Sequence, residues 1–269
     1  MTELGTALIT GASSGMGAAF ADRLAKRGYG LIVVARNEQR LNGLARRLTT
    51  ETGVKVDVLT ADLTSRADVR RVEQRLRSDD SITLLVNDAG AGTPKPVLVE
   101  DVDFLESVVE LNVVAAHRLA IAAAQVFAAR GRGGIINVSS IAALHPEHVN
   151  ATYSASKAFI LNLTQALHTE AAPKGIRVQV VLPGATRTEF FERFGVSIDS
   201  RFPPEMIMEA TDLVDAALAG FDQGELVTIP SLPNLKDWEK FVSARLALDP
   251  NLSRREPAAR YGLTGASRS

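Results

Sequence analysis

The sequence predicts a doubly wound α/β fold, in which helices cover both faces of a parallel sheet of about seven strands within a single domain. Short apolar runs alternate along the chain with stretches of helical periodicity, the order expected of repeated strand–helix–strand units. Several runs are rich in valine, isoleucine and leucine without polar alternation, which is typical of strands buried on both faces. An apolar run near the N-terminus also leads through a glycine-rich turn into an alanine-rich helical stretch.

The expected elements follow in order. Strands are expected at residues 7–10, 30–35, 55–60, 84–86, 134–138, 177–182 and 226–229. Helices are expected over residues 15–27, 37–50, 65–78, 102–130, 152–173 and 204–221. The repeating pattern thus occupies residues 1–230. In the remaining segment, 231–269, Trp238, Phe241, Leu246 and Leu248 predict one more amphipathic helix. This segment is expected either to belong to the same domain or to form an arm that contacts another subunit.

Composition excludes several classes of protein. The 269 residues are 46% hydrophobic, which is enough for a core on both faces of a sheet. The net charge is −1 and the sequence has no dense basic block, so no nucleic-acid partner is expected. No cysteine is present, which excludes disulfides, thiolate chemistry and cysteine-ligated metals. The first strand begins too near Met1 for a signal peptide, and the apolar stretch 119–129 is too short to span a bilayer. We therefore expect a cytoplasmic protein with no membrane partner.

The glycine turn carries the first functional signal. Thr10-Gly11-Ala12-Ser13-Ser14-Gly15-Met16-Gly17 stands between an apolar run and a helical stretch, which is the order of a dinucleotide-binding unit. The first glycine permits the tight turn, the second lets the backbone approach a pyrophosphate, and the third lets the helix pack close to the strand. The phosphates would face free amides at the positive end of the helix. Because an ordinary turn can have the same residues, the motif alone does not decide the function.

A tyrosine and a lysine carry the second signal. Tyr153 and Lys157 are four residues apart, which places both side chains on one face of the expected helix. An ammonium near a phenol favours the phenolate, so we expect the pKa of Tyr153 to lie below its usual value of ~10. Such a phenol exchanges a proton with an alcohol or carbonyl oxygen near neutral pH. Taken alone, the spacing is more often a chance match that forms a solvated surface pair.

Together with further motifs, these two signals make the chain resemble the classical short-chain dehydrogenase/reductase family from about Leu4 to Ile229. The matching elements are the glycine turn, Asp62, Asn87-Asp88-Ala89-Gly90, Asn112, Asn137-Val138-Ser139-Ser140, Tyr153 with Lys157, and Pro183-Gly184 leading to Thr188. The resemblance implies a Rossmann-type fold and transfer of hydride between a nicotinamide cofactor and a small-molecule carbonyl or secondary alcohol. One alternative is a non-catalytic cofactor-binding regulatory protein, which would be expected to lack the tyrosine or the lysine. Another is an extended-branch enzyme such as a sugar epimerase, which the glycine spacing and the length disfavour.

The resemblance assigns catalytic roles to four residues. Tyr153 is implied as the general acid/base, and Lys157 as the residue that lowers its pKa and binds the nicotinamide ribose. Ser140, rather than the adjacent Ser139, is implied to hydrogen-bond the substrate oxygen, because a hydroxyl both donates and accepts. Asn112 is implied to bind, through its backbone carbonyl, a water that links Lys157 to solvent. Asparagine is a poor helix former, so its position within an expected helix is itself unusual.

The resemblance also implies a cofactor site. Asp62 would bind the adenine amino group, and the segment after Pro183 would bind the nicotinamide carboxamide. The implied set is Gly11, Ser13, Ser14, Gly15, Met16, Gly17, Arg36, Asp62, Leu63, Asn87, Ala89, Gly90, Tyr153, Lys157, Pro183, Gly184, Thr186 and Thr188. Asp88 departs from the family pattern, which has a second asparagine there, and a carboxylate cannot donate as an amide does. We expect weaker cofactor binding, or compensation by a nearby arginine.

The end of the second strand indicates which cofactor is used. An NAD enzyme needs a carboxylate there to accept bonds from the ribose 2′-hydroxyl. Ala35 stands in that place, and the guanidinium of Arg36 can bind a 2′-phosphate through paired, charge-assisted bonds. Arg40 would either assist or remain at the surface. The sequence therefore predicts NADP(H).

Three further features are expected around the substrate. Residues 189–204, here called the aromatic segment, contain Phe190, Phe191, Phe194 and Phe202 and follow the sixth strand on the side of the sheet where ligands bind. We expect a mobile lid or, alternatively, a packed surface loop. His145 and His148 border the same region, either as surface residues or as binders of a polar substrate, and no metal site is expected.

Assembly is also predicted. Helices 102–130 and 152–173 are apolar on more than one side, and in the family such helices pair across subunits, so we expect a homodimer or homotetramer.

Overall fold

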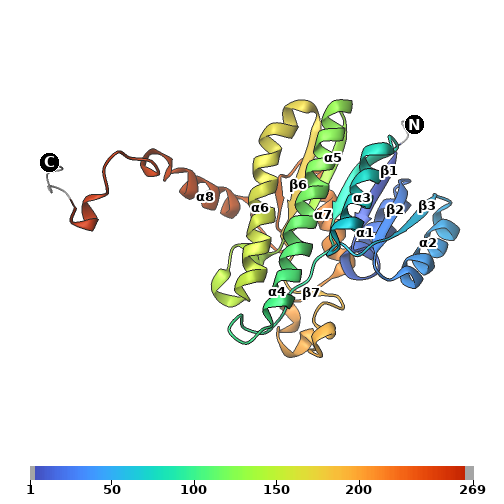
Figure 1. Cartoon of the computed structure of the whole chain (residues 1–269), viewed down its shortest axis with the longest axis horizontal. Helices are drawn as coiled ribbons and strands as arrows, with labels where there is room; N and C mark the ends of the chain where they lie inside the picture. The colour runs from blue at the N-terminus through green and yellow to red at the C-terminus, as the bar shows by residue number, and fades with distance from the viewer. Residues whose placement is uncertain (1–3, 264–269) are drawn as a thin grey trace. The chain divides into compact units, whose positions relative to one another are not determined.

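Seven parallel strands form the central sheet of the protein, whose computed structural model describes residues 4–263. Their order across the sheet is β3-β2-β1-β4-β5-β6-β9 (Figure 1). The strands are β1 Thr6–Thr10, β2 Gly30–Ala35, β3 Val56–Thr60, β4 Ile82–Asn87, β5 Gly133–Val138, β6 Ile176–Val181 and β9 Val227–Thr228. The order reverses at β1, so the carboxyl ends of β1 and β4 form the crevice where such sheets bind ligands. The predicted fold class is confirmed.

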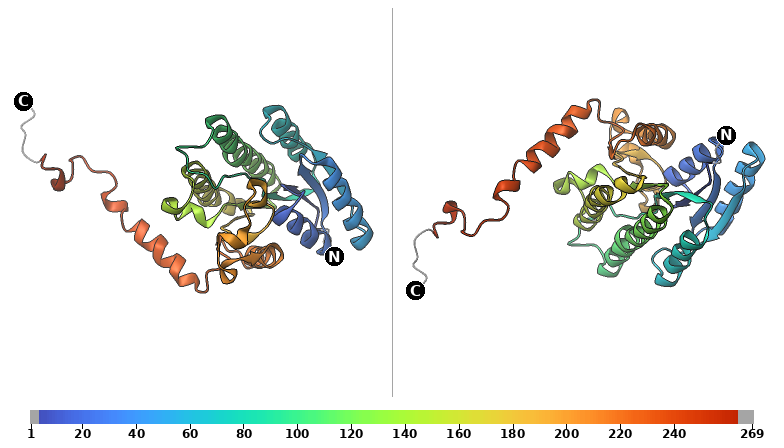
Figure 2. Two further views of the ribbon diagram at one scale, coloured as in Figure 1. Left: turned by 90° about the horizontal axis from the view of Figure 1, so that it is seen from below. Right: turned by 90° about the horizontal axis from the view of Figure 1, so that it is seen from above.

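Helices cover both faces of the sheet, and the two views of Figure 2 show the sheet between two helical layers. One layer contains α1 Gly15–Lys26, α2 Glu38–Thr52 and α7 Ala210–Gln223. The other contains α3 Arg66–Ser78, α4 Val102–Val109, α5 Ala116–Arg130 and α6 Ala151–Ala171. Alternate residues of each strand supply the two cores: in β1, Ala7 and Ile9 face α1, whereas Leu8 faces the opposite layer.

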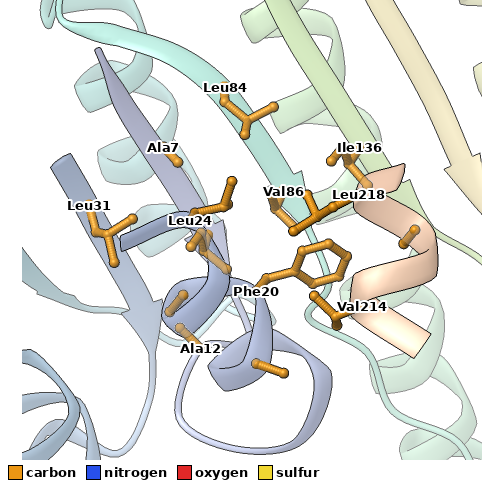
Figure 3. Close-up of a cluster of buried hydrophobic side chains, with 14 of the residues drawn as sticks. Ala7, Ala12, Phe20, Leu24, Leu31, Leu84, Val86, Ile136, Val214 and Leu218 are labelled. Carbon is orange, nitrogen blue, oxygen red and sulfur yellow. The ribbon is translucent and has the colours of Figure 1, made fainter. Parts of the chain in front are cut away.

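The first core fixes the position of the glycine turn. Phe20 and Leu24 of α1 lie between the sheet and α7, in the cluster that includes Val86, Val214 and Leu218 (Figure 3). Phe20 is fully buried, and burial of such a side chain contributes about 1.5–3 kcal/mol. Because α1 is held in this way, its first turn stays at the carboxyl end of β1.

The predicted helix 102–130 is present but interrupted. A π-helix, Glu110–Ala115, separates α4 from α5 and contains Asn112. The whole run Val102–Arg130 is long and apolar enough, by length and composition, to cross a membrane. However, α5 contacts β4, β5 and α3, and its Leu119, Ala123 and Phe127 lie in the second core. Burial in the core accounts for its apolar character.

The predicted helix 204–221 is wrong at its start. Pro204–Met206 forms a 3₁₀ turn, Met208–Glu209 forms strand β8, and α7 begins only at Ala210. β8 pairs with β7, Thr186–Arg187, which was not predicted. The two consecutive prolines, Pro203 and Pro204, favour an extended chain followed by a turn over an immediate α-helix. β7 precedes the aromatic segment and β8 follows it, so the pairing of the two strands holds the ends of that segment together.

The chain divides into two compact units, with the boundary between Pro230 and Ser231. The second unit contains α8, Leu235–Leu246, which begins after Asn234; the side chain of Asn234 accepts a hydrogen bond from the Lys236 amide. The apolar residues that predicted this helix include Phe241, which is half exposed at 49%. None of the α8 residues is buried. The last part of the predicted tail, residues 264–269, lies outside the described chain.

The remaining regular elements are short 3₁₀ turns. They lie at Ile141–Ala143, Pro146–His148, Ala172–Lys174, Glu192–Phe194, Ile198–Ser200, Asp249–Asn251 and Ala259–Tyr261. The first two separate β5 from α6, and those at 192–194 and 198–200 lie within the aromatic segment, so the loops on this side of the sheet are locally ordered.

Candidate active site

A cleft of about 1220 Å³ opens at the carboxyl end of the sheet. Small-molecule pockets typically enclose ~300–1,000 Å³, so this cleft has room for more than one drug-sized ligand. Most predicted site residues line it, including Ser13, Met16, Leu63, Gly184 and Thr186. Gly17, Asn87 and Asn112 are not among its lining residues.

The glycine turn has the geometry that a phosphate group requires. Gly11 has a φ of 73°, in the left-handed region that favours glycine. A Cβ on Gly17 would lie 2.4 Å from the Gly11 carbonyl oxygen, so only glycine allows α1 to approach the turn this closely. The first turn of α1 holds no acidic residue, and its N-cap Ser14 makes no capping bond. Apart from the Gly17 amide, which donates to the Asp88 carboxylate, the amides of the first turn and its positive dipole remain available to an anion, and these residues fit a dinucleotide.

Tyr153 and Lys157 are brought together on α6, as predicted. The Lys157 Nζ lies 5.8 Å from the centre of the Tyr153 ring and donates a hydrogen bond of 3.1 Å to the Val138 carbonyl oxygen. Burial lowers the pKa of Lys157 to about 8, against the opposing effect of Asp88.

The sequence predicted a lowered pKa for Tyr153. This prediction is wrong when only the groups of the protein act on the phenol. Burial of the phenol raises its pKa, and the negative charge of Asp88 acts in the same direction. The Ser140 hydroxyl opposes these two effects through hydrogen bonding, but burial prevails. The spacing of Tyr153 and Lys157 indicated the neighbouring ammonium, yet it did not reveal how strongly the site would be desolvated, and desolvation disfavours the phenolate.

The two serines after β5 have different contacts. Ser139 is buried, and its hydroxyl donates a 2.7 Å hydrogen bond to the carbonyl oxygen of Lys157, which fixes α6 against the sheet. Ser140 accepts a hydrogen bond from the Ala142 amide and acts on the Tyr153 phenol, and both serines line the cleft. Because the Ser139 hydroxyl is engaged with the backbone, these contacts favour Ser140, whose role towards a substrate stays a prediction.

Asn112 lies in the π-helix, and its side chain hydrogen-bonds two neighbouring segments. Its side-chain oxygen accepts from the Ala91 amide at 2.8 Å, and its nitrogen donates to the Ala91 carbonyl at 2.8 Å and to the Ser156 hydroxyl at 3.0 Å. These bonds join the π-helix, the chain after β4 and α6. π-Helical segments occur frequently at functional sites. The sequence signal was the asparagine within a helix; its side-chain partners were not predicted.

Asn87 supports the sheet rather than the cleft wall. Its amide donates to the Asn137 side chain at 3.0 Å and to the Ala116 carbonyl at 3.1 Å. Asn137 in turn donates to the Thr164 hydroxyl. This polar chain ties β4 and β5 to α5 and α6 beneath the site.

The carboxylate of Asp88 lies beside the glycine turn, and its Oδ2 is 2.8 Å from the position of a Cβ on Gly17. Burial raises the pKa of Asp88 to about 7, while Lys157 and the Gly17 amide lower it. Among the residues that the structure describes, its Oδ1 is buried with no hydrogen-bond partner. Lys157 is thus the cation that acts on Asp88, and weaker cofactor binding, or its compensation by an arginine, stays a prediction.

The end of β2 presents the predicted arginine. Arg36 is exposed at the cleft edge, across from Asp62 of the next strand end. Burial opposes ionisation of Asp62, but hydrogen bonds from the Thr64 amide and hydroxyl, together with the charge of Arg36, lower its pKa. Arg40 lines the cleft and forms an ion pair with Glu189 of the aromatic segment, and its assistance to a 2′-phosphate stays a prediction.

The aromatic segment borders the cleft beside Tyr153. The ring centres of Phe190 and Tyr153 lie 5.9 Å apart, and Phe190 also contacts Phe191 and Phe194 edge-on. Sequence reasoning found these rings but missed Arg193, whose guanidinium donates to the Ser14 hydroxyl of the glycine turn at 3.1 Å. Its signal was a basic residue between the phenylalanines of this run.

Both histidines also line the cleft. The rings of His145 and His148 are 6.2 Å apart. Within residues 4–263, no group of three or more histidine, cysteine, aspartate or glutamate side chains is arranged to hold a metal ion.

Comparisons with known proteins agree with this geometry. The family model described as short chain dehydrogenase matches residues 5–196. A short-chain dehydrogenase from Sphingobium yanoikuyae, solved in complex with NADPH, is 45% identical with a TM-score of 0.92, covering 96% of this chain and 100% of that one. The bulky-bulky ketone specific alcohol dehydrogenase from Comamonas testosteroni is 45% identical with a TM-score of 0.89, covering 97% and 99%.

A curated relative is more distant. An uncharacterized oxidoreductase of Staphylococcus epidermidis is 30% identical over 224 residues, covering 83% of this chain and 93% of its own length. With the family model spanning most of the sheet and both motifs in one cleft, this chain belongs to the classical short-chain dehydrogenase/reductase family of oxidoreductases.

Proposed function

We propose that this protein is an NADP(H)-dependent oxidoreductase that interconverts a carbonyl compound and a secondary alcohol, with Tyr153 as the general acid/base. The observation that carries the proposal is the meeting of Tyr153, Ser140 and Lys157 in a cleft that also contains an anion-binding glycine turn. Proton transfer requires the phenol to be within reach of the substrate oxygen, and Tyr153 lines the cleft. The intact tyrosine and lysine disfavour the non-catalytic alternative.

In the reducing direction, a nicotinamide cofactor bound in the cleft would supply the hydride to the carbonyl carbon. Ser140 donates a hydrogen bond to the carbonyl oxygen and so orients it. Tyr153 gives its phenolic proton to that oxygen as the C–O double bond becomes a single bond. The ammonium of Lys157 stabilises the phenolate that remains. The phenol is protonated before the reaction, because burial raises its pKa.

The preference for NADP(H) over NAD(H) is part of the proposal. Arg36 is exposed at the cleft edge, and Ala35 leaves no carboxylate beside it. A carboxylate at this place would repel a 2′-phosphate, whereas a guanidinium attracts one. The relative from Sphingobium yanoikuyae was solved with NADPH, which supports the same choice.

We infer a bulky, largely apolar ketone as the substrate class. Phe190, Phe191 and Phe202 of the aromatic segment line the cleft together with Pro94, Val97 and Leu98 of the chain after β4. An apolar lining of this extent favours a carbonyl that carries large apolar groups. The Comamonas testosteroni relative is named for bulky-bulky ketones, which supports this inference.

Reduction of a ketone panel tests the proposal. Oxidation of NADPH should be followed spectroscopically with small dialkyl ketones and with diaryl ketones. We expect turnover of the diaryl ketones with NADPH and little turnover with NADH. Tight binding of NADPH without turnover of any ketone or alcohol would instead support the regulatory alternative.

A further inference from the structure

Arg193 is a basic residue of the aromatic segment to which the proposed reaction assigns no role. It lies in the 3₁₀ turn Glu192–Phe194 and is exposed. Its guanidinium donates a hydrogen bond of 3.1 Å to the hydroxyl of Ser14, the N-cap residue of α1. Because an N-cap side chain lies beside the first amides of its helix, this bond holds a positive charge at the amino end of α1.

The chain that leads into the aromatic segment lies against the same end of α1. A Cβ on Gly15, the first residue of α1, would lie 3.2 Å from the Cγ2 atom of Thr188. Both elements line the cleft, through Ser13, Ser14 and Gly15 of the turn and through Thr188 and Arg193 of the later chain. The two elements therefore adjoin in the cleft wall, and a group bound at the α1 amides is within reach of Arg193.

The charge of Arg193 is not compensated within the part of the chain that the structure describes. It forms no ion pair there, and the carboxylates of Glu189 and Asp199 in the same segment pair with other arginines. The first turn of α1 holds no acidic residue either. Since the amino end of a helix carries a partial positive charge, a cation beside it is repelled. Two positive groups thus meet, and an anion bound between them would interact favourably with both.

A pyrophosphate has the chemistry that these two groups recognise. Helix amides bind some of its oxygens, and a guanidinium binds others through paired, charge-assisted hydrogen bonds. We propose that Arg193 is a cofactor-binding residue whose guanidinium binds the pyrophosphate of the dinucleotide from the side of the aromatic segment. This inference rests on the proposed reductase function, and it adds to the glycine turn a contact from a segment that the glycine motif does not include.

Arg193 also connects the cofactor site to the wall of the substrate site. Its turn includes Phe194, whose ring centre lies 6.0 Å from that of Phe190. The ring centre of Phe190 lies in turn 5.9 Å from that of Tyr153, the proposed acid. A pyrophosphate held by Arg193 would therefore hold the aromatic segment, and with it Phe190, beside Tyr153.

The test is Arg193→Gln, which removes the charge and keeps a hydrogen-bonding side chain. The dissociation constants of NADPH and NADH should be measured by fluorescence titration. Both should rise by roughly tenfold, because both cofactors carry the pyrophosphate and a hydrogen bond to a charged group contributes on this scale. Adenosine 2′-phosphate, which has no pyrophosphate, should bind the parent and the variant equally in competition titrations.

Arg201→Gln is the matched control. Arg201 belongs to the same segment, lines the same cleft and is exposed. Its replacement removes the same charge and leaves the contact between Arg193 and Ser14 intact, so the affinities for both cofactors should stay near those of the parent. Arg193→Lys keeps the charge without the paired geometry, and it should lose less affinity than Arg193→Gln.

A second readout follows the segment itself. Chymotrypsin cleaves after phenylalanine, so limited digestion measures how well the aromatic segment is held. Saturating NADPH should protect this segment in the parent and in Arg201→Gln, and should protect it less in Arg193→Gln. Equal protection in all three proteins would contradict a contact between the segment and the cofactor.

The outcomes separate this inference from the reductase function. A loss of affinity shared by NADPH and NADH, without turnover of any ketone, supports the role of Arg193 and counts against the reductase function. Unchanged affinities overturn the role of Arg193. A loss confined to NADPH also overturns it, because the guanidinium would then act on the 2′-phosphate. In both of these cases, turnover of a ketone leaves the reductase function standing.

Discussion

Arg40 of α2 and Glu189 of the aromatic segment form an ion pair, with 2.6 Å between guanidinium nitrogen and carboxylate oxygen. Arg40 is one helical turn beyond Arg36, at the edge proposed to bind the 2′-phosphate. A second contact joins the aromatic segment to the glycine turn, because the guanidinium of Arg193 donates a hydrogen bond to the Ser14 hydroxyl. Both contacts connect the wall of the substrate cleft to elements proposed to bind the cofactor.

This relationship predicts that Glu189 competes with the 2′-phosphate for Arg40. In Glu189→Gln we expect NADPH to bind roughly 3- to 10-fold more tightly, within the ~1.4 kcal/mol that a tenfold change represents. NADH, which lacks the phosphate, should bind unchanged. Both side chains are substantially exposed, so little change in stability is expected.

Fluorescence titration with each reduced cofactor measures these affinities. Glu192→Gln, which removes a carboxylate from the same segment, serves as the control. Equal tightening for NADH and NADPH would show that the ion pair acts on the segment and not on the phosphate.

The second prediction concerns proton transfer. Tyr153→Phe keeps the ring, and thus its contact with Phe190, but removes the exchangeable proton. Turnover should fall by a factor on the order of 10² or more, the usual contribution of a general acid. NADPH binding and the melting temperature should change little. Near-parental turnover of a ketone that the parent reduces would show that Tyr153 is not the acid.

The third prediction concerns cofactor choice. Ala35→Asp combined with Arg36→Gln supplies a carboxylate for the ribose 2′-hydroxyl and removes the proposed phosphate partner. The ratio of kcat/KM for NADPH to that for NADH should fall by at least about tenfold, the effect of ~1.4 kcal/mol. Arg46→Gln, an arginine of α2 that does not line the cleft, is the control. If the parent itself binds NADH as tightly as NADPH, the preference proposed here is wrong.

Much of this architecture was predictable from sequence because it depends on local patterns. Apolar runs located all seven strands of the sheet, and the glycine turn and the Tyr153–Lys157 spacing located the site. What could not be predicted depends on contacts between distant segments. The β7–β8 pair, the Arg40–Glu189 ion pair and the side-chain bonds of Asn112 join residues that are far apart in the chain. The raised pKa of Tyr153 likewise reflects burial, which no single motif encodes.

The fourth prediction concerns assembly. Val102, Val109 and Val114 on the α4–α5 helical run, and Phe159 on α6, are partly exposed apolar side chains. An unpaired apolar face of this kind favours association, so we predict a homodimer or homotetramer built on these helices. Val109→Glu with Phe159→Glu should shift the mass measured by light scattering towards the monomer. A parent that is monomeric at micromolar concentration would contradict the prediction.

The last prediction links Asp88 to stability. The pKa of its carboxyl is about 7 in the folded protein, against the ordinary value of 3.8 that we take for the unfolded chain. Between these values the unfolded state releases the proton more readily, so this group lowers stability as pH rises through that window, and the penalty is complete above about pH 7. A shift of about three units corresponds to at most ~4 kcal/mol.

Asp88→Asn should therefore unfold at higher urea concentration than the parent above about pH 7, and the advantage should shrink towards about pH 4. Urea titrations across this range measure the difference, with Asp80→Asn as the control. A difference independent of pH would mean that Asp88 is not held as a buried carboxyl.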